Sequence, residues 1–299
     1  MGIFRRLTTS SESTAVFPFV FRITTSVANT VFTLPLTDFG GLTPSITVSW
    51  GDSTSSTITS STSLSRNHTY VSAGTYTISI SGFMPGFKVN NNASIRSLII
   101  ELVQWGIVGI RTIDFYGCNN LTSIPGSAAL DLVGGYTGLN EVQNFSGFMR
   151  STGLTTIPAD IFDYSPNASI FSNTFAFTPI TSIPSGLFDN VPNATDFTSC
   201  FSNCTALSSV PSTLFDLNVN AINFSSTFRN CLSVSSPLQF TNNTQVTVFS
   251  NLYNMASTTN AMTGTAPQLW NRVPAPVGTD AFRNCFNLGN YAAIPTIWK

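Results

Sequence analysis

The chain has 299 residues and a formal net charge of −1, and only 8% of its residues are charged, whereas 42% are apolar and 12% are aromatic. This apolar content is ample for a buried core, which excludes a disordered chain. Its basic residues form no stripe and no apolar run reaches the ~20 residues that span a bilayer, which argues against nucleic-acid binding and membrane insertion. The polar surface must then consist mainly of Ser, Thr and Asn, which favours an outward-facing shell protein or adhesin.

Residues 1–13 are predicted to form a polar N-terminal arm. Because no apolar stretch follows Arg5 and Arg6, the arm is not predicted to be a signal peptide. From residue 14 to 92, short runs rich in β-branched and aromatic residues, such as FVFRITT and SITVSW, are separated by Gly, Pro, Asp and Ser. This pattern is typical of an antiparallel β-sandwich.

Three short motifs in this half resemble the PKD-type β-sandwich. They are Trp50-Gly51-Asp52, His68-Thr69-Tyr70 and Gly74-Thr75-Tyr76. His68 is the only histidine of the chain and lies within the second motif. A lone histidine is a candidate catalytic base, but a structural hydrogen bond next to Tyr70 is the preferred interpretation, and a metal site built from several histidines is excluded.

Residues 93–299 contain repeats, with residues 93–111 predicted to cap them at the N-terminal end. The strings GLTTIPADIFD, PITSIPSGLFD and ALSSVPSTLFD end at Asp163, Asp189 and Asp216, so the spacings are 26 and 27 residues. A second pattern, F-x-x-C-x-x-L-x-x-[IV]-P, occurs at residues 115–125 and 201–211, and F-x-x-C returns at Phe228 and Phe282. Such a fixed period predicts a solenoid of stacked repeats.

Each repeat is predicted to combine a short helix with a short extended segment. Phe197, Phe201 and Cys204 have the i, i+4, i+7 spacing of one helix face, and Leu207 and Val210 follow as an extended stretch that Pro211 ends. Equivalent side chains would then stack as a ladder. The predicted ladder residues are Phe115, Cys118, Leu121, Phe201, Cys204, Leu207, Phe228, Cys231, Phe282 and Cys285.

The two halves together resemble the BspA-type leucine-rich-repeat surface proteins, on the PKD-like motifs, the Gln104-Trp105-Gly106 segment and the string FYGCNNLTSIP. The resemblance implies an N-terminal all-β sandwich followed by a leucine-rich-repeat solenoid, and a role in binding or adhesion. That family has bacterial surface members and members encoded in phage genomes, and this chain resembles the family as an expected phage-encoded member. The chain departs from the pattern in the long 115–148 interval, at Phe175, and over residues 249–275.

The five cysteines leave three alternatives open. Cys118, Cys204, Cys231 and Cys285 share one repeat position, and Cys200 lies beside it. Reduced core residues are the preferred interpretation, because free Cys behaves as a small hydrophobic side chain and the count is odd. Disulfides between adjacent repeats and a metal site are the other two, although neither paired C-x-x-C motifs nor a second histidine is present for zinc.

The repeat-equivalent Asp163, Asp189 and Asp216 are the only acids that suggest a site. A column of carboxylates on one side of a solenoid is able to bind calcium or a sugar, but a ladder of turn residues is the preferred interpretation. No sequence motif of a hydrolase, metalloprotease or P-loop occurs, so no catalytic residue and no cofactor are expected.

These observations predict a non-enzymatic structural and binding protein on the exterior of a phage virion, as a capsid decoration or tail-fibre protein. Its expected partners are other capsid or tail proteins and host surface glycans or proteins, and we expect a homo-oligomer or a lattice-bound protein. A bacterial cell-surface adhesin is the main alternative. A polysaccharide depolymerase, which requires a pair of acids in a groove, is less favoured.

Overall fold

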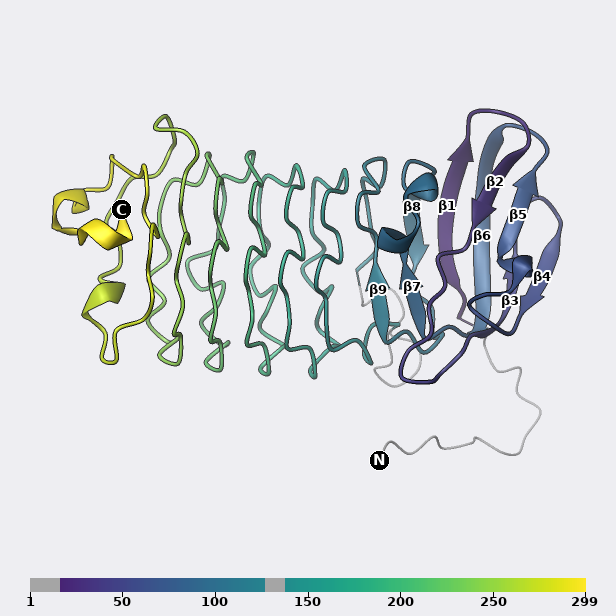
Figure 1. The fold of residues 1–299 in the computed structure, drawn as a ribbon, viewed down its shortest axis with the longest axis horizontal. Coiled ribbons are helices and arrows are strands. Elements are labelled where there is room, and N and C mark those ends of the chain that lie inside the picture. The colour runs from purple at the N-terminus through teal and green to yellow at the C-terminus, as the bar shows by residue number, and fades with distance from the viewer. Residues whose placement is uncertain (1–16, 127–137) are drawn as a thin grey trace.

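The computed structural model describes residues 17–126 and 138–299, and it places a sheet region and a stack of loops side by side along one axis (Figure 1). One hydrophobic core runs through both, from Phe19 in the first strand to Trp298 beside the C-terminus. Among the described residues, no helix is long and apolar enough to cross a membrane.

The sheet region is built on a five-stranded antiparallel sheet of order β4-β3-β6-β1-β8. Its strands are β1 (Phe19–Thr25), β3 (Ser45–Ser49), β4 (Ser55–Ile58), β6 (Gly74–Phe83) and β8 (Ile99–Gln104). Every second residue of β1 is buried, as the alternation of FVFRITT requires for a strand with one face on the core. β8 lies beyond residue 92, where the predicted sandwich ends, and pairs with β1.

Two smaller sheets accompany it. β2 (Thr30–Thr33) and β5 (Asn67–Tyr70) form an antiparallel pair, whereas β7 (Gly86–Lys88) and β9 (Thr112–Asp114) form a parallel pair. Phe32 of β2 packs against Phe21 of β1 with ring centroids 5.9 Å apart, so the β2–β5 pair covers one face of the large sheet. The 3-10 helices are η1 (Leu64–Arg66), η2 (Val89–Asn91), η3 (Ala93–Ile95), η5 (Leu269–Asn271), η6 (Tyr291–Ala293) and η7 (Thr296–Trp298).

Beyond β9 the chain winds into stacked loops, here called rungs, that are joined by backbone hydrogen bonds. Parallel bridges connect one rung to the next, in the order Asn144, Ile170, Asp196, Asn223, Val248 and Val277. In the rung that contains Phe197, every second N–H group donates to the following rung: these donors are Phe197, Ser199, Phe201 and Asn203. The N–H groups between them, those of Cys200 and Ser202, donate to the carbonyl group three residues earlier in the same rung.

The predicted fold class, an N-terminal sandwich followed by a leucine-rich-repeat solenoid with short helices and short strands, is therefore wrong. The described residues are mostly strands and loops; they contain no helix of seven or more residues, and their sheets are small, mainly antiparallel and not closed. The alternating donors explain the missing helices, because an α-helix needs each successive N–H group for its own i−4 carbonyl group. Ser199 and Asn203 also have positive φ angles of 56° and 62°, which interrupt a right-handed helix.

Three columns of aromatic rings fill the rungs. The first column runs through Phe175, Phe201, Phe228, Tyr253 and Phe282, with neighbouring centroids 5.4 to 6.0 Å apart. The second runs through Phe145, Phe171, Phe197, Phe224 and Phe249. The third runs through Phe162, Phe188, Phe215 and Phe240. Near-parallel rings repeat because each rung places the same side chain one backbone spacing further along.

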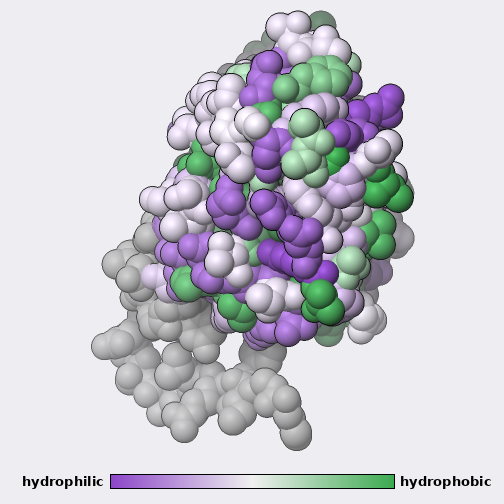
Figure 2. All heavy atoms as spheres, turned by 90° about the vertical axis from the view of Figure 1, so that its left-hand side faces the viewer, coloured by the Kyte–Doolittle hydropathy of each residue, from purple (hydrophilic) through white to green (hydrophobic). Residues whose placement is uncertain are grey.

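The stack ends at its C-terminal side on a tryptophan. The last rung has Gly278 where the preceding rungs have the phenylalanines of the second column, and a Cβ atom at Gly278 would lie 2.2 Å from the Trp298 ring. The Trp298 ring therefore closes the core where a further phenylalanine would otherwise stack. The outer face of this end is mostly hydrophilic or neutral, with hydrophobic residues only scattered over it (Figure 2).

Candidate functional site

The predicted ladder residues all lie in the core. Each of the ten, from Phe115 to Cys285, is completely or almost completely buried. Phe201 stacks on Phe228 at 5.6 Å, and Tyr253 stands between Phe228 and Phe282. Phe115 instead contacts Phe87 of β7 and Trp105, so it joins the rungs to the sheet region.

The cysteines are free thiols buried in the rungs. The N–H groups of Cys118, Cys204, Cys231 and Cys285 each donate to the aromatic residue three positions earlier, so these four hold one shared position. The thiols of Cys204, Cys231 and Cys285 donate to carbonyl oxygens of the preceding rung at 3.1 to 3.2 Å. Among the residues that the structure describes, no group of His, Cys, Asp and Glu side chains is arranged to hold a metal ion.

Burial also disfavours the reactive thiolate form of these cysteines. It raises the pKa of Cys204 to about 11 and the pKa values of Cys118 and Cys285 to about 12. Cys200 occupies the position that Thr174 and Thr227 hold in neighbouring rungs, and burial raises its pKa as well. A thiol that stays protonated is a poor nucleophile and a poor metal ligand, so burial disfavours both roles for Cys200 and Cys204.

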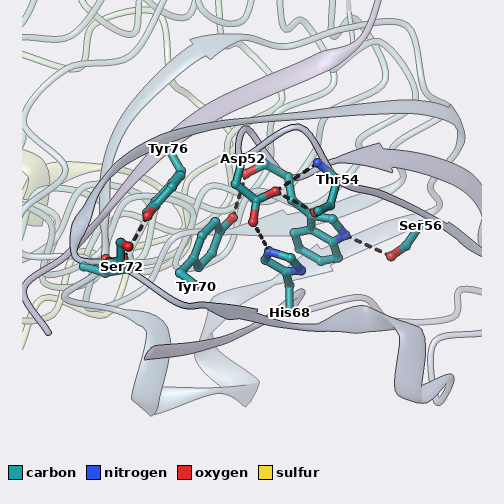
Figure 3. Close-up of polar contacts among 9 residues, drawn as sticks. Asp52, Thr54, Ser56, His68, Tyr70, Ser72 and Tyr76 are labelled. Atoms are coloured by element: carbon teal, nitrogen blue, oxygen red, sulfur yellow. Dashed lines mark hydrogen bonds and ion pairs between the residues drawn. The ribbon is translucent and has the colours of Figure 1, made fainter. Parts of the chain in front are cut away.

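The sandwich-type motifs meet in one polar cluster at the end of the sheet region (Figure 3). His68 Nε2 lies 2.7 Å from Asp52 Oδ2, and the His68 ring stacks on Trp50 at 4.7 Å. The Tyr70 hydroxyl donates to the Trp50 carbonyl oxygen at 2.8 Å, and Trp50 Nε1 donates to Ser56 Oγ at 2.9 Å. These contacts tie β5 to the turn between β3 and β4.

The His68–Asp52 pair is a structural brace in this arrangement. Burial acts most strongly on the Asp52 pKa and would raise it, but hydrogen bonds from Thr54 and His68 outweigh burial and lower the pKa. The His68 ring contacts Trp50 face to face and Tyr70 edge to face, and its hydrogen-bond partner among the described residues is Asp52. The contacts of His68 are thus those of a residue that holds β5 against the turn after β3.

The aspartate column lies at turns. The N–H groups of Asp163, Asp189 and Asp216 each donate to the carbonyl group three residues earlier, which places the three acids at equivalent positions. Asp163 Oδ1 accepts a hydrogen bond from Asn190 Nδ2 of the next rung at 3.0 Å. In the following rung Asp163 therefore contacts the amide group of Asn190, whereas an acid pair would need a second carboxylate there.

A polar groove of about 480 Å³ lies where β7 and β9 meet the first rungs. We call it the junction groove; it is lined by Lys88, Asn90, Asp114, Tyr116, Arg150 and Asn173, among others. Asp114 is buried, Asn90 N–H donates to its Oδ1 atom at 2.7 Å, and Lys88 Nζ lies 3.9 Å from its Oδ2 atom. Burial raises the Asp114 pKa, against the opposing effects of Asn90 and Lys88.

Sequence reasoning missed this groove because no local motif marks it. Its residues come from two strands and from separate rungs, which only the fold brings together. One signal was present: Phe177 stands where neighbouring rungs have Asn203 and Asn230, and all three have positive φ angles of 58° to 62°. An aromatic residue in the left-handed region is rare, whereas Asn adopts it readily.

A scan against protein-family models finds none that matches the chain, and a search of curated proteins finds no significant match.

Proposed function

We propose that this protein is a non-enzymatic structural and binding component of a phage virion, displayed on the outside of the particle as a capsid decoration or tail-fibre protein. It binds other capsid or tail proteins as an oligomer or within a lattice, and it presents its rungs to host surface glycans or proteins.

The observation that carries the proposal is how each rung divides its side chains. In the rung at 196–204 the Phe and Cys side chains and Ser202 are buried, whereas Asp196, Thr198, Ser199 and Asn203 are partly exposed. In this rung the partly exposed side chains are thus hydroxyl and amide groups and one carboxylate, and they lie over a core of stacked aromatic rings. Such a surface offers many hydrogen-bonding groups at fixed spacing, which suits recognition better than chemistry.

The proposal is tested on particles. Virions of the phage that encodes the chain are purified on a density gradient, digested and examined by mass spectrometry, and intact particles are labelled with antibodies against the purified protein. We expect the chain in the particle fraction and the label on the particle exterior. A major capsid protein serves as the positive control, and a non-structural phage protein serves as the negative control.

Three outcomes would overturn the proposal. Absence of the chain from purified particles excludes a virion role, and antibody labelling of uninfected bacterial cells would instead support a cell-surface adhesin. Labelling only of disrupted particles would place the protein inside the particle and contradict the outward-facing role.

A further inference from the structure

The junction groove contains an arginine that is held in place but not neutralised. The Arg150 guanidinium group lies over the Tyr116 ring at 5.3 Å and over the Phe177 ring at 5.4 Å. Among the described residues, the Arg150 side chain makes no hydrogen bond or ion pair, and its Nε atom is buried without a partner. The guanidinium group is therefore oriented by aromatic rings while its donors remain available.

The other charges of the groove are already paired. Lys88 Nζ lies 3.9 Å from the Asp114 carboxylate, to which the Asn90 N–H group also donates. Arg96, which donates to the neutral Asn90 and lies over the Tyr116 ring at 4.9 Å, is not among the residues that line the groove. Lys88 and Arg150 together exceed the single charge of Asp114, so the groove has a net positive charge. Its unpaired charge is the Arg150 guanidinium group.

Phe177, one of the two aromatic residues that contact Arg150, has an unfavourable backbone conformation. Phe177 has a φ angle of 61° and is 48% exposed, whereas the equivalent positions of the next rungs are Asn203 and Asn230. A bulky residue at positive φ costs conformational energy, and such residues gather at functional sites. The contact with Arg150 gives Phe177 a role that an Asn side chain would not have.

The groove also offers room and neutral hydrogen-bonding groups. Gly147 lines it where Asn173 stands in the next rung, and a Cβ atom at Gly147 would meet nothing within 4 Å. Asn144, Ser146 and Asn173 add amide and hydroxyl groups to the wall. A planar fork of N–H donors matches a carboxylate in two-point geometry, while amides and hydroxyls match sugar hydroxyl groups.

We propose that the junction groove binds an acidic saccharide, with Arg150 receiving the carboxylate of a uronic-acid residue and Asn144 and Asn173 contacting its hydroxyl groups. Phe177 and Tyr116 act as positioning residues for the guanidinium group. The inference rests on the proposed function, because an outward-facing protein is one that meets the acidic polysaccharides of a host surface.

The test is calorimetric binding of short oligosaccharides to the full chain at low and at physiological salt. The probes are an oligogalacturonate, a neutral malto-oligosaccharide of equal length, and inorganic phosphate. We expect the oligogalacturonate to bind and the neutral sugar not to bind. Arg150→Gln should weaken the binding about ten- to a hundredfold, the range of one charge-assisted bidentate contact.

Arg229→Gln is the matched control. Arg229 holds the same rung position as Arg150, because the N–H groups of Asn203 and Gly117 donate to the carbonyl oxygens of Arg229 and Arg150 respectively. It is exposed and lies outside the groove. Its replacement removes the same charge and should leave the affinity for oligogalacturonate unchanged.

Two further variants separate binding from folding. Gly147→Asn inserts the side chain of the neighbouring rung into the open space and should abolish binding, with the melting temperature kept. Phe177→Asn restores the residue of neighbouring rungs and should weaken binding severalfold without lowering the melting temperature, because Asn tolerates positive φ.

Equal binding by wild-type and Arg150→Gln proteins, or equal loss in Arg229→Gln, would overturn the assignment to Arg150. Phosphate binding as tight as oligogalacturonate binding would overturn the saccharide part. The outcome is independent of the virion test: a particle protein that binds no uronate refutes only this inference, and a uronate-binding protein that is absent from particles refutes only the proposed function.

Discussion

The sheet region and the stack of rungs reach a common core by different means. In the sheet region each contact occurs once: Trp50, His68 and Tyr70 come from separate segments and meet in a single cluster. In the rungs one contact is repeated, because Phe201 stacks on the equivalent residue above it and on the equivalent residue below it. Antiparallel strand pairing supports the first region, and alternating rung-to-rung hydrogen bonds support the second.

This difference determines how damage should spread. A substitution within the sheet cluster affects the few partners of one residue, whereas a substitution in a ladder affects two rungs at once and leaves a gap inside a column. The four predictions below test this contrast, beginning with the largest expected effect.

Phe201→Ala should give the largest loss of stability. Phe201 is fully buried between Phe175 and Phe228, and truncation of such a side chain leaves a cavity that costs about 3–5 kcal/mol of unfolding free energy. Urea denaturation measures the loss. The control is Phe286→Ala, in which a phenylalanine that is 51% exposed is removed, and it should cost less than about 1 kcal/mol. Equal effects of the two variants would contradict a ladder that supports the stack.

Alkaline pH should destabilise the rungs before the sheet region, since all five cysteines lie after β9. Burial raises the pKa of Cys204 to about 11 and those of Cys118 and Cys285 to about 12, from 9.0. Because these folded-state values exceed the unfolded-state ones, the stabilisation is fully present below pH 9 and is lost progressively as the pH rises from 9 to the folded-state values of about 11 and 12. The loss is about 1 kcal/mol for each of these thiols by pH 10.

Urea denaturation in reducing buffer between pH 8 and pH 10 measures this loss, and hydrogen exchange assigns it to a region. A Cys204→Ala variant should show a shallower dependence on pH, since one titrating thiol is gone. An unfolding free energy that is constant between pH 8 and pH 10 would show that the thiols are not protected by burial.

Tyr70→Phe should cost about 1–3 kcal/mol, because it leaves the buried Trp50 carbonyl oxygen without the hydroxyl donor at 2.8 Å. Tyr76→Phe is the matched control: its hydroxyl also donates to a backbone carbonyl oxygen, that of Ser72, but in an exposed setting, so its loss should be within about 0.5 kcal/mol. Thermal unfolding of both variants measures the difference. Identical melting temperatures for the two variants would show that the hydrogen bond from Tyr70 to the Trp50 carbonyl oxygen does not stabilise the fold.

Substitutions of Ser199 test the backbone conformation of a rung, and their expected effect on stability is the smallest of the four. Its φ angle is 56°, so Ser199→Val should lose about 1–2 kcal/mol, because a β-branched residue is disfavoured in the left-handed region. Ser199→Gly relieves the same constraint and should keep or raise the melting temperature. If valine were tolerated as well as glycine, the alternating turn geometry of the rungs would be incorrect.

The repeat period and the buried residues could be read from the sequence, but the secondary structure of the repeats could not. Phe197, Phe201 and Cys204 are spaced as on a helix face, and all three are indeed buried. The same spacing also arises in a rung, where successive N–H groups donate alternately to the next rung and to the carbonyl group three residues earlier. Asn203 and Ser199 are residue types that tolerate or favour positive φ angles, and they were the local signal for this second solution.

The candidate site was less accessible to sequence reasoning. The sequence motifs predicted a structural hydrogen bond for His68 beside Tyr70, but not its pairing with Asp52 or its stacking on Trp50. The junction groove joins Lys88 of β7, Asp114 of β9 and Arg150 of a rung, and their proximity depends on where the sheet region ends and the stack begins. No spacing rule within one segment encodes that junction.

Gly278 and Trp298 have a consequence for the length of the molecule. Trp298 covers the C-terminal end of the second aromatic column, and this contact does not depend on the number of rungs that precede it. A duplication of 26 or 27 residues between two existing rungs would extend the rod by one backbone spacing, about 4.8 Å, and leave both ends intact. The reach of this protein is thus a quantity that evolution can adjust in equal steps, independently of the groove at one end and the tryptophan at the other.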